Sequence, residues 1–242
     1  MRTSKHLYVR ILCLSIFAWL PVGSVHAQVS EGVSSALLSR CVGKTGSVVR
    51  QGDPAFMTIA LDGLPWMTIE QTESTVGIQP ISTTVTGTGW YRRRGGTTVF
   101  FRFTCVLDEQ RQPVMFHAST LLHDLGDRLP PSVLIEGTAA YPDKSPLPRG
   151  VELQVQLVDP SRPPESRIIA EQVVRSGWLV PMPFVLRLSK DTSLTDRTLL
   201  ISARMVLAHQ TLYELEQPRM VTAADLTKPL DLTLSKPRVP GR

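Results

Sequence analysis

The sequence predicts a mostly β protein, with a small α+β domain over residues 28–128 followed by a seven-stranded antiparallel β-sandwich over residues 129–235. Nineteen prolines and sixteen glycines among 242 residues, with a charged fraction of only 19%, are unfavourable for long helices. Apolar and polar residues alternate with a period of two in most runs after the first cysteine of the mature chain. In the second half, short runs of this kind are separated by turn residues at the spacing typical of a sandwich.

The first 27 residues have the pattern of a cleaved secretory signal peptide. Three basic residues precede a short apolar stretch at residues 11–20, and a small-residue cleavage site ends at Ala27. Ten apolar residues span about 15 Å as a helix, which is too short to cross a bilayer. Cys13 lies near the start of the apolar stretch, whereas a lipoprotein cysteine follows it. We therefore expect a periplasmic protein that begins at Gln28 and has no lipid anchor.

The charge balance of the mature chain excludes a nucleic-acid footprint. Three of the 26 basic residues lie in the signal, so 23 basic and 21 acidic residues remain. The highest charge density is the turn Arg92-Arg93-Arg94, which can at most make peripheral contact with anionic lipids, at about 1 kcal/mol per residue. A soluble hairpin tip is the plainer interpretation of these arginines.

Two cysteines remain after export, Cys41 and Cys105. An oxidising compartment favours a disulfide between them, and closing such a loop contributes about 4 kcal/mol in the chain-entropy model. Two separate buried thiols are the alternative.

The first domain is predicted to pack one helix on a small sheet. Helical spacing of apolar residues over residues 31–40 leads into Cys41. Strands are expected at residues 84–91, 97–107 and 114–121, and the first two form a hairpin whose turn uses glycine. Within residues 97–107, Cys105 lies on the apolar face with Val99, Phe101, Phe103 and Leu107.

Prolines at residues 130 and 131 mark the start of the second domain, because they prevent a helix or a central strand from running through. Its strands are expected at residues 133–140, 151–158, 168–175, 183–189, 198–207, 211–215 and 230–234. Val151, Leu153, Val155 and Leu157 are predicted to face the core, and Glu152, Gln154 and Gln156 to face solvent. Residues 236–242 are expected to form a disordered tail.

No catalytic motif is present. A metal could be ligated by His123, Asp124 and Asp127, but these residues lie in a solvated linker and no known ligand spacing supports a site there. Glu171 and Glu214 are interpreted as solvated charges on strands, and neither a nucleophile elbow nor a phosphate-binding loop is found. We expect no enzyme activity, cofactor or metal. An enzyme or small-ligand site between the two domains, using Glu214, His209 or His117, is the alternative.

A series of short motifs follows in order along the second domain. The motifs are Ile135-Glu136-Gly137-Thr138-Ala139-Ala140-Tyr141, Leu147-Pro148-Arg149-Gly150-Val151-Glu152-Leu153, Val158-Asp159-Pro160-Ser161-Arg162, Ile169-Ala170-Glu171-Gln172 and Val180-Pro181-Met182-Pro183-Phe184. Together they resemble the YbaY/YscW family of envelope proteins, which includes the lipoprotein chaperones, or pilotins, of type III secretion secretins. The resemblance implies a non-catalytic β-sandwich that binds or chaperones a secretin or another outer-membrane component. Members of the pilotin branch are lipidated at their first mature residue, which Gln28 cannot be.

The last of these motifs is the candidate partner-binding segment. This segment consists of Val180, Pro181, Met182, Pro183 and Phe184. It cannot form a central strand, because a proline has no backbone N–H to donate to a neighbouring strand. An edge strand of this kind can accept a partner's strand. A proline-guarded edge that prevents aggregation is the alternative.

Overall fold

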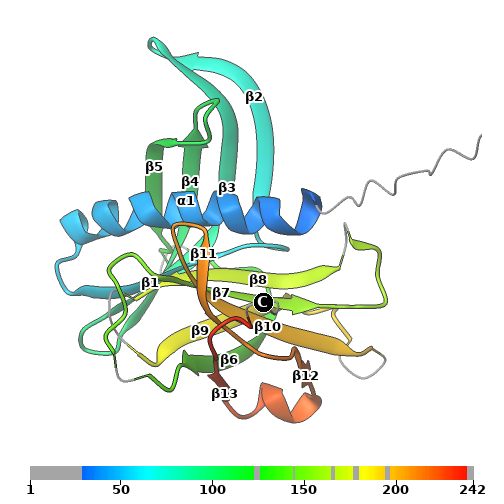
Figure 1. Ribbon diagram of the computed structural model, residues 1–242. Coiled ribbons are helices and arrows are strands. Elements are labelled where there is room, and N and C mark those ends of the chain that lie inside the picture. Colours follow the sequence, from blue (N-terminus) through cyan, green and yellow to red (C-terminus); the bar gives the residue numbers. More distant parts are fainter. Residues whose placement is uncertain are drawn as a thin grey trace, which may run out of the picture.

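A computed structural model describes residues 29–122, 126–143, 145–164, 167–176, 180–193 and 197–238, and it is mostly β (Figure 1). The predicted signal peptide, together with His123 and Asp124, lies outside these residues. The elements are α1 (Val29–Gly52), β1 (Phe56–Asp62), β2 (Thr68–Val76), β3 (Gln79–Arg93), β4 (Thr98–Leu107), β5 (Pro113–Thr120), β6 (Ser132–Ala140), β7 (Glu152–Val158), β8 (Ile168–Arg175), β9 (Met182–Ser189), β10 (Leu199–Leu207), β11 (Gln210–Glu214), β12 (Arg219–Val221), the short 3-10 helix η3 (Ala223–Leu226) and β13 (Leu230–Thr233).

The predicted fold class is confirmed, and two details of the sandwich differ. Within the described residues, one sheet has ten strands with the order β11-β10-β7-β8-β1-β3-β4-β5, and β12 and β2 pair with β10 and β3. A second sheet has the order β13-β6-β9. The short strand β12 makes eight strands after residue 129, where seven were predicted. The expectation of a fully antiparallel sandwich is wrong at β13, which pairs parallel to β6 because η3 and its flanking turns carry the chain across before it re-enters the sheet.

The sandwich core lies between β7, β8 and β10 on one side and the three-stranded sheet on the other. The predicted inward residues of β7 are fully buried, as are Phe184 and Leu186 of β9. Apolar burial of this kind is the main stabilising contribution, at about 25 cal/mol per Å². We call this side of β7 and β8 the inner face.

The first half has its own core, under α1. The predicted disulfide joins Cys41 of α1 to Cys105 of β4, whose Cα atoms are 6.0 Å apart. Phe101, Phe103 and Leu107 are buried on the same face as Cys105, as the alternation predicts. The helix continues twelve residues past its predicted end, because apolar residues of its second half, including Val42 and Val49, also pack into this core. It ends before Pro54, which disfavours helical backbone at the preceding residue.

Strand β1 connects the two halves of the molecule. It pairs with β3 on one side and with β8 on the other, both antiparallel. The large sheet therefore crosses the predicted boundary at residues 128/129 without interruption, and the division into two domains stays a prediction.

The outer face of β7 and β8 is not solvated, and the predictions for Glu152, Gln154 and Glu171 are wrong. These side chains are buried, with 7%, 8% and 2% of their surface exposed. The reason is that α1 lies across this face, which sequence alternation alone does not reveal (Figure 1).

The hairpin β2–β3 extends away from the rest of the molecule, above α1 (Figure 1). We call residues 68–86 the arm, because over this length β2 pairs with β3 from Thr68↔Thr86 to Val76↔Gln79. Eight of the nine residues of β2 are exposed. Within the described part of the chain, β2 pairs with β3 alone, so the other edge of β2 is open.

Candidate functional site

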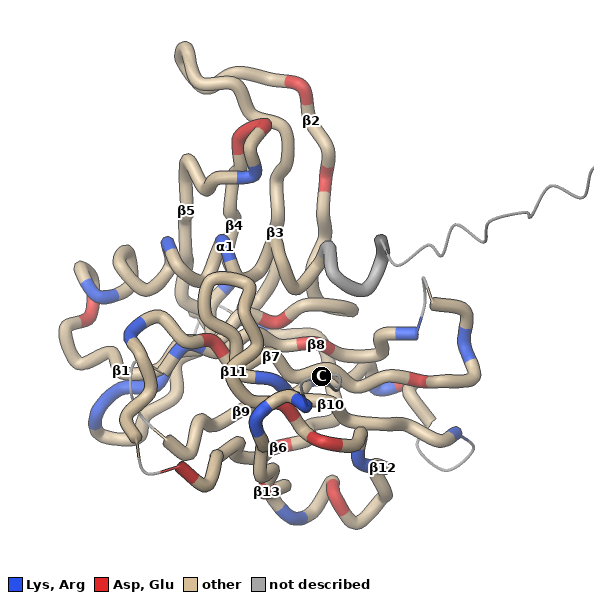
Figure 2. Tube along the Cα trace, in the orientation of Figure 1, with Lys and Arg blue, Asp and Glu red and all other residues tan. Residues whose placement is uncertain are grey.

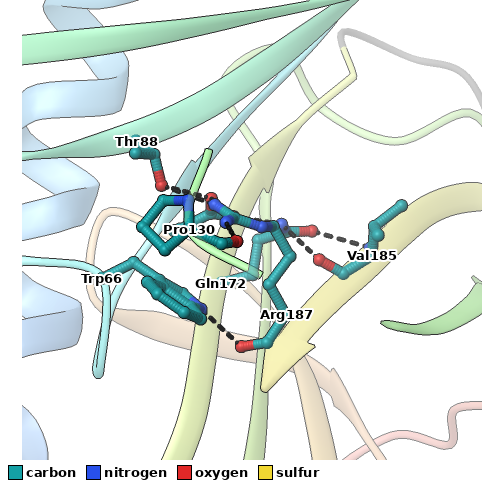
Figure 3. Close-up of polar contacts among 7 residues, drawn as sticks. Trp66, Thr88, Pro130, Gln172, Val185 and Arg187 are labelled. Atoms are coloured by element: carbon teal, nitrogen blue, oxygen red, sulfur yellow. Dashed lines mark hydrogen bonds and ion pairs between the residues drawn. The ribbon is translucent and has the colours of Figure 1, made fainter. Parts of the chain in front are cut away.

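A buried polar network joins the two halves where β1 and β3 meet β8 and β9 (Figure 3). Arg187 of β9 lies 3.1 Å from Asp62 of β1 and donates to the Thr88 hydroxyl at 2.9 Å. Thr88 and Gln172 donate to the two carboxylate oxygens of Asp62 at 2.7 and 2.8 Å. Burial raises the pKa of Asp62, against the opposing effect of the Arg187 charge. With all these groups satisfied internally, the network acts as a structural joint.

The same network covers the outer edge of β9, which is the edge strand that the sequence predicts. The Gln172 amide donates to the Val185 carbonyl at 2.7 Å and accepts from the Val185 N–H at 2.9 Å. The Trp66 indole donates to the Arg187 carbonyl at 2.7 Å, and the Arg187 guanidinium lies over the Trp66 ring at 4.6 Å (Figure 3). A partner strand could therefore pair with β9 only as far as Pro183, because the backbone groups of Val185 and the Arg187 carbonyl already have hydrogen-bond partners.

The predicted partner-binding segment lies at the start of β9. Met182 and Phe184 are buried in the sandwich core, Val180 and Pro183 are half-buried, and Pro181 is exposed. Only the backbone edge and the prolines are thus available to a partner here. The binding role of this segment stays a prediction.

The arginine turn between β3 and β4 is partly engaged by the protein itself. Arg93 lies 2.5 Å from Asp53, and Arg92 lies over the Trp90 ring at 5.6 Å. Gly96 takes the left-handed conformation expected of the turn, with φ of 85°. Arg94 is exposed, so the turn offers fewer free charges to an anionic surface than its sequence suggests.

The outer face and α1 meet through hydrogen bonds, beside the apolar contact of Val173 with the core under α1. Ser34 and Ser35 of α1 both donate to the Glu171 carboxylate, which also accepts from Gln156 at 2.7 Å. The amide of Gln154 donates to Ser39 at 3.0 Å. Buried polar groups need partners of this kind, and α1 supplies them as serines. The first half of the chain therefore completes the outer face of the second half.

A groove of about 490 Å³ lies beside this contact, between α1 and the hairpin of β10 and β11. Its lining includes Arg40, Arg149, Arg175, Arg204 and His209. Of the three residues named for a site between the halves, only His209 lies here. Glu214 lines a separate hollow of about 180 Å³, and His117 is exposed on β5.

Neither a metal site nor a membrane span is found in the described residues. No group of three or more His, Cys, Asp or Glu side chains in the described ranges is placed to hold a metal ion. Likewise, none of the helices in that part of the chain has the length and apolar character needed to cross a bilayer.

The second half matches a known protein family. Residues 130–234 match the model of the type III secretion system lipoprotein chaperone family, YscW. These residues form a YscW-like domain. A solved structure of an alternative pilotin from the type II secretion system of Vibrio cholerae is also similar, with 22% identity and a TM-score of 0.39, covering 45% of this chain and 100% of that chain. No curated protein matches the sequence.

The YscW-like domain contains strands β6 to β13, and the predicted resemblance is confirmed for this part of the chain. Helix α1 and strands β1 to β5 lie outside the matched residues. The helix that covers the outer face of the YscW-like domain thus comes from the half that the match does not reach. Arg40 and the helical side of the groove lie in that half as well.

Proposed function

We propose that this chain is a non-catalytic periplasmic protein that binds or chaperones a secretin or another outer-membrane component of a secretion system. The observation that carries this proposal is the match of residues 130–234 to a family of secretion system lipoprotein chaperones. The motifs behind the match are turns and strands rather than groups placed for bond chemistry.

Export to the periplasm is supported by two features of the chain. The first 27 residues have the charge and apolar pattern of a signal peptide. The disulfide between Cys41 and Cys105 suits an oxidising compartment. Gln28 at the expected start of the mature chain favours a protein that acts without its own lipid anchor.

Two strand edges are suited to a protein partner. The arm presents the open edge of β2, and its tip carries two exposed apolar side chains, Val76 and Ile78, with 60% and 102% of their surface exposed. An extended peptide can add to such an edge through main-chain hydrogen bonds. The segment just before β9, at Val180-Pro181, is the second candidate edge.

Photo-crosslinking in living cells tests the proposal. A crosslinking amino acid is placed at Thr75 on the arm, at Pro181 before β9, and at Glu136, which is exposed on β6 and serves as the control. We expect Thr75 or Pro181 to capture an outer-membrane secretion component that Glu136 does not capture. If neither position captures more of any such component than Glu136 does, the proposal is wrong.

A small-ligand site between the two halves is the second candidate function. The groove between α1 and the β10–β11 hairpin favours it, because the groove contains His209 and draws residues from both halves. Sites for small molecules are typically closed and mostly apolar, whereas this groove is open and lined by arginines. We therefore rank it below protein binding.

A further inference from the structure

We propose that the groove between α1 and the β10–β11 hairpin binds an acidic stretch of a partner polypeptide. The proposal deepens the proposed function, on which it rests, by assigning a place and a chemistry to protein binding. It uses residues of both halves of the chain and does not depend on the arm or on β9.

The groove has a strong excess of positive charge. Four arginines line it, namely Arg40, Arg149, Arg175 and Arg204, against one carboxylate, Glu152. That carboxylate is buried and lies 3.1 Å from Arg175, so it is already paired. Most basic segments of the chain lie in the body that contains the groove, whereas the arm carries two acidic residues and no basic one (Figure 2).

Several of these donors have no partner among the residues that the structure describes. Arg40 and Arg149 make no hydrogen bond or ion pair with any described residue. Arg175 contacts Glu152 and the Gly150 carbonyl, and its Nε atom is buried, so Arg40 and Arg149 supply the free guanidinium groups. Arg204 uses its Nε on Gln154, at 2.7 Å. Guanidinium groups bind carboxylates through paired hydrogen bonds, so this set is suited to a ligand that carries several carboxylates.

The hairpin tip at the rim of the groove is strained. Ala208 and His209 both have left-handed backbone, with φ of 47° and 71°. A two-residue turn of this type favours asparagine and glycine, because a Cβ atom makes the conformation unfavourable. Both residues line the groove, and backbone strain of this kind concentrates at binding and catalytic sites.

The shape of the groove favours an extended peptide. A neighbouring hollow of about 430 Å³ shares Arg149, Gly150 and Arg175 with the groove and adds Arg50. Together the two hollows follow α1 from Ser35 to Arg50, a distance of about 22 Å at 1.5 Å per residue. An extended chain covers that distance in about six or seven residues.

Two other anionic ligands fit less well. A single phosphate is small, so it would contact only some of the arginines that line the two hollows along α1. A bilayer surface is flat, whereas these arginines line a groove between a helix and a hairpin.

Fluorescence anisotropy on the mature chain tests the proposal. The probe is a labelled decapeptide with six glutamates, and the comparison peptide carries glutamine in their place. The variant R40Q/R149Q removes the two unpartnered arginines, and R94Q/R128Q is the matched control with the same charge change at exposed sites elsewhere. Inorganic phosphate and phosphatidylglycerol vesicles are the competing ligands.

We expect the glutamate peptide to bind and R40Q/R149Q to weaken binding about a hundredfold, because each charge-assisted contact contributes about tenfold. The control should stay within about twofold, since it leaves the groove intact. Equal loss in both variants, absence of peptide binding, or a groove-dependent preference for phosphate or vesicles would overturn the proposal. If the peptide binds but crosslinking captures no envelope partner, the proposed function fails and the groove remains. If crosslinking succeeds without peptide binding, only the groove proposal fails.

Discussion

The inner and outer faces of β7 and β8 are both buried, yet they are buried in different ways. Leu153, Val155 and Leu157 on the inner face pack against the three-stranded sheet with apolar contacts. Gln154 and Glu171 on the outer face are buried through hydrogen bonds to serines of α1. An apolar face can pack against any complementary apolar layer, whereas buried polar groups need hydrogen-bond partners at specific positions. The position of α1 is therefore specified by polar contacts as well as by the disulfide.

The largest expected effect is on the inner face. Phe184→Ala should lower the free energy of unfolding by about 4 kcal/mol, because it leaves a cavity in the sandwich core. Urea denaturation monitored by circular dichroism measures this loss. Val185→Ala, on the half-buried side of the same strand, is the matched control and should cost less than half as much. Equal costs at the two positions would contradict the assignment of the inner face.

The joint between the halves should show the next largest effect. Arg187→Met should cost about 3 kcal/mol, because the buried Asp62 carboxylate loses its compensating charge. The double variant Asp62→Leu/Arg187→Met removes both charges and should be more stable than the single variant, again by urea denaturation. A double variant that is less stable than Arg187→Met would show that the carboxylate does not depend on the arginine.

The outer face should show a smaller effect of the same sign. Glu171→Ala should cost about 2 kcal/mol, because Ser34, Ser35 and Gln156 lose their shared acceptor. Thermal unfolding of the variant beside Glu214→Ala, a half-buried glutamate away from α1, measures the difference. Equal losses of stability in the two variants would contradict the burial of Glu171 under α1.

The smallest effect concerns the dependence of stability on pH. Burial raises the pKa of Glu152 above its ordinary value of 4.5, although hydrogen bonding to Ser39 and the charge of Arg175 act in the opposite direction. The folded state thus holds this proton more tightly than the unfolded state. The contribution of Glu152 to stability should be greatest below pH 4.5 and should decrease as the pH rises through the raised pKa.

Glu152→Gln removes this titration and serves as its own test. The difference in unfolding free energy between the two proteins, measured from pH 4 to pH 8, should shift in favour of the variant as the pH rises. A difference that shifts in favour of the glutamate would mean that the Arg175 charge outweighs burial.

The sequence predicts the inner layer of the fold well, because the alternation in residues 151–158 and 198–207 is a local pattern. It does not predict β1, whose buried residues at 58–62 lack the alternation of a half-exposed strand, although the apolar run at 59–61 is typical of strands covered on both faces. It also misses β2, since exposure on both faces leaves no core-facing pattern. The burial of Glu171 depends on a helix more than 130 positions away, which no local pattern records.

The groove is hidden from sequence reasoning for the same reason. Its arginines come from α1, the turn before β7, and strands β8 and β10, so they form no motif along the chain. One local signal of the groove exists. Ala208 and His209 connect two strands in a turn that usually contains asparagine or glycine.

A double-mutant cycle between Ser35 and Glu171 shows whether α1 completes the outer face of the YscW-like domain. Unfolding free energies are measured for the unmodified protein, Ser35→Ala, Glu171→Ala and the double variant. The contact predicts a coupling energy of about 1 kcal/mol, because each single change breaks the same hydrogen bond. A coupling energy of zero would mean that α1 does not lie on this face, and it would remove the helical wall of the groove as well.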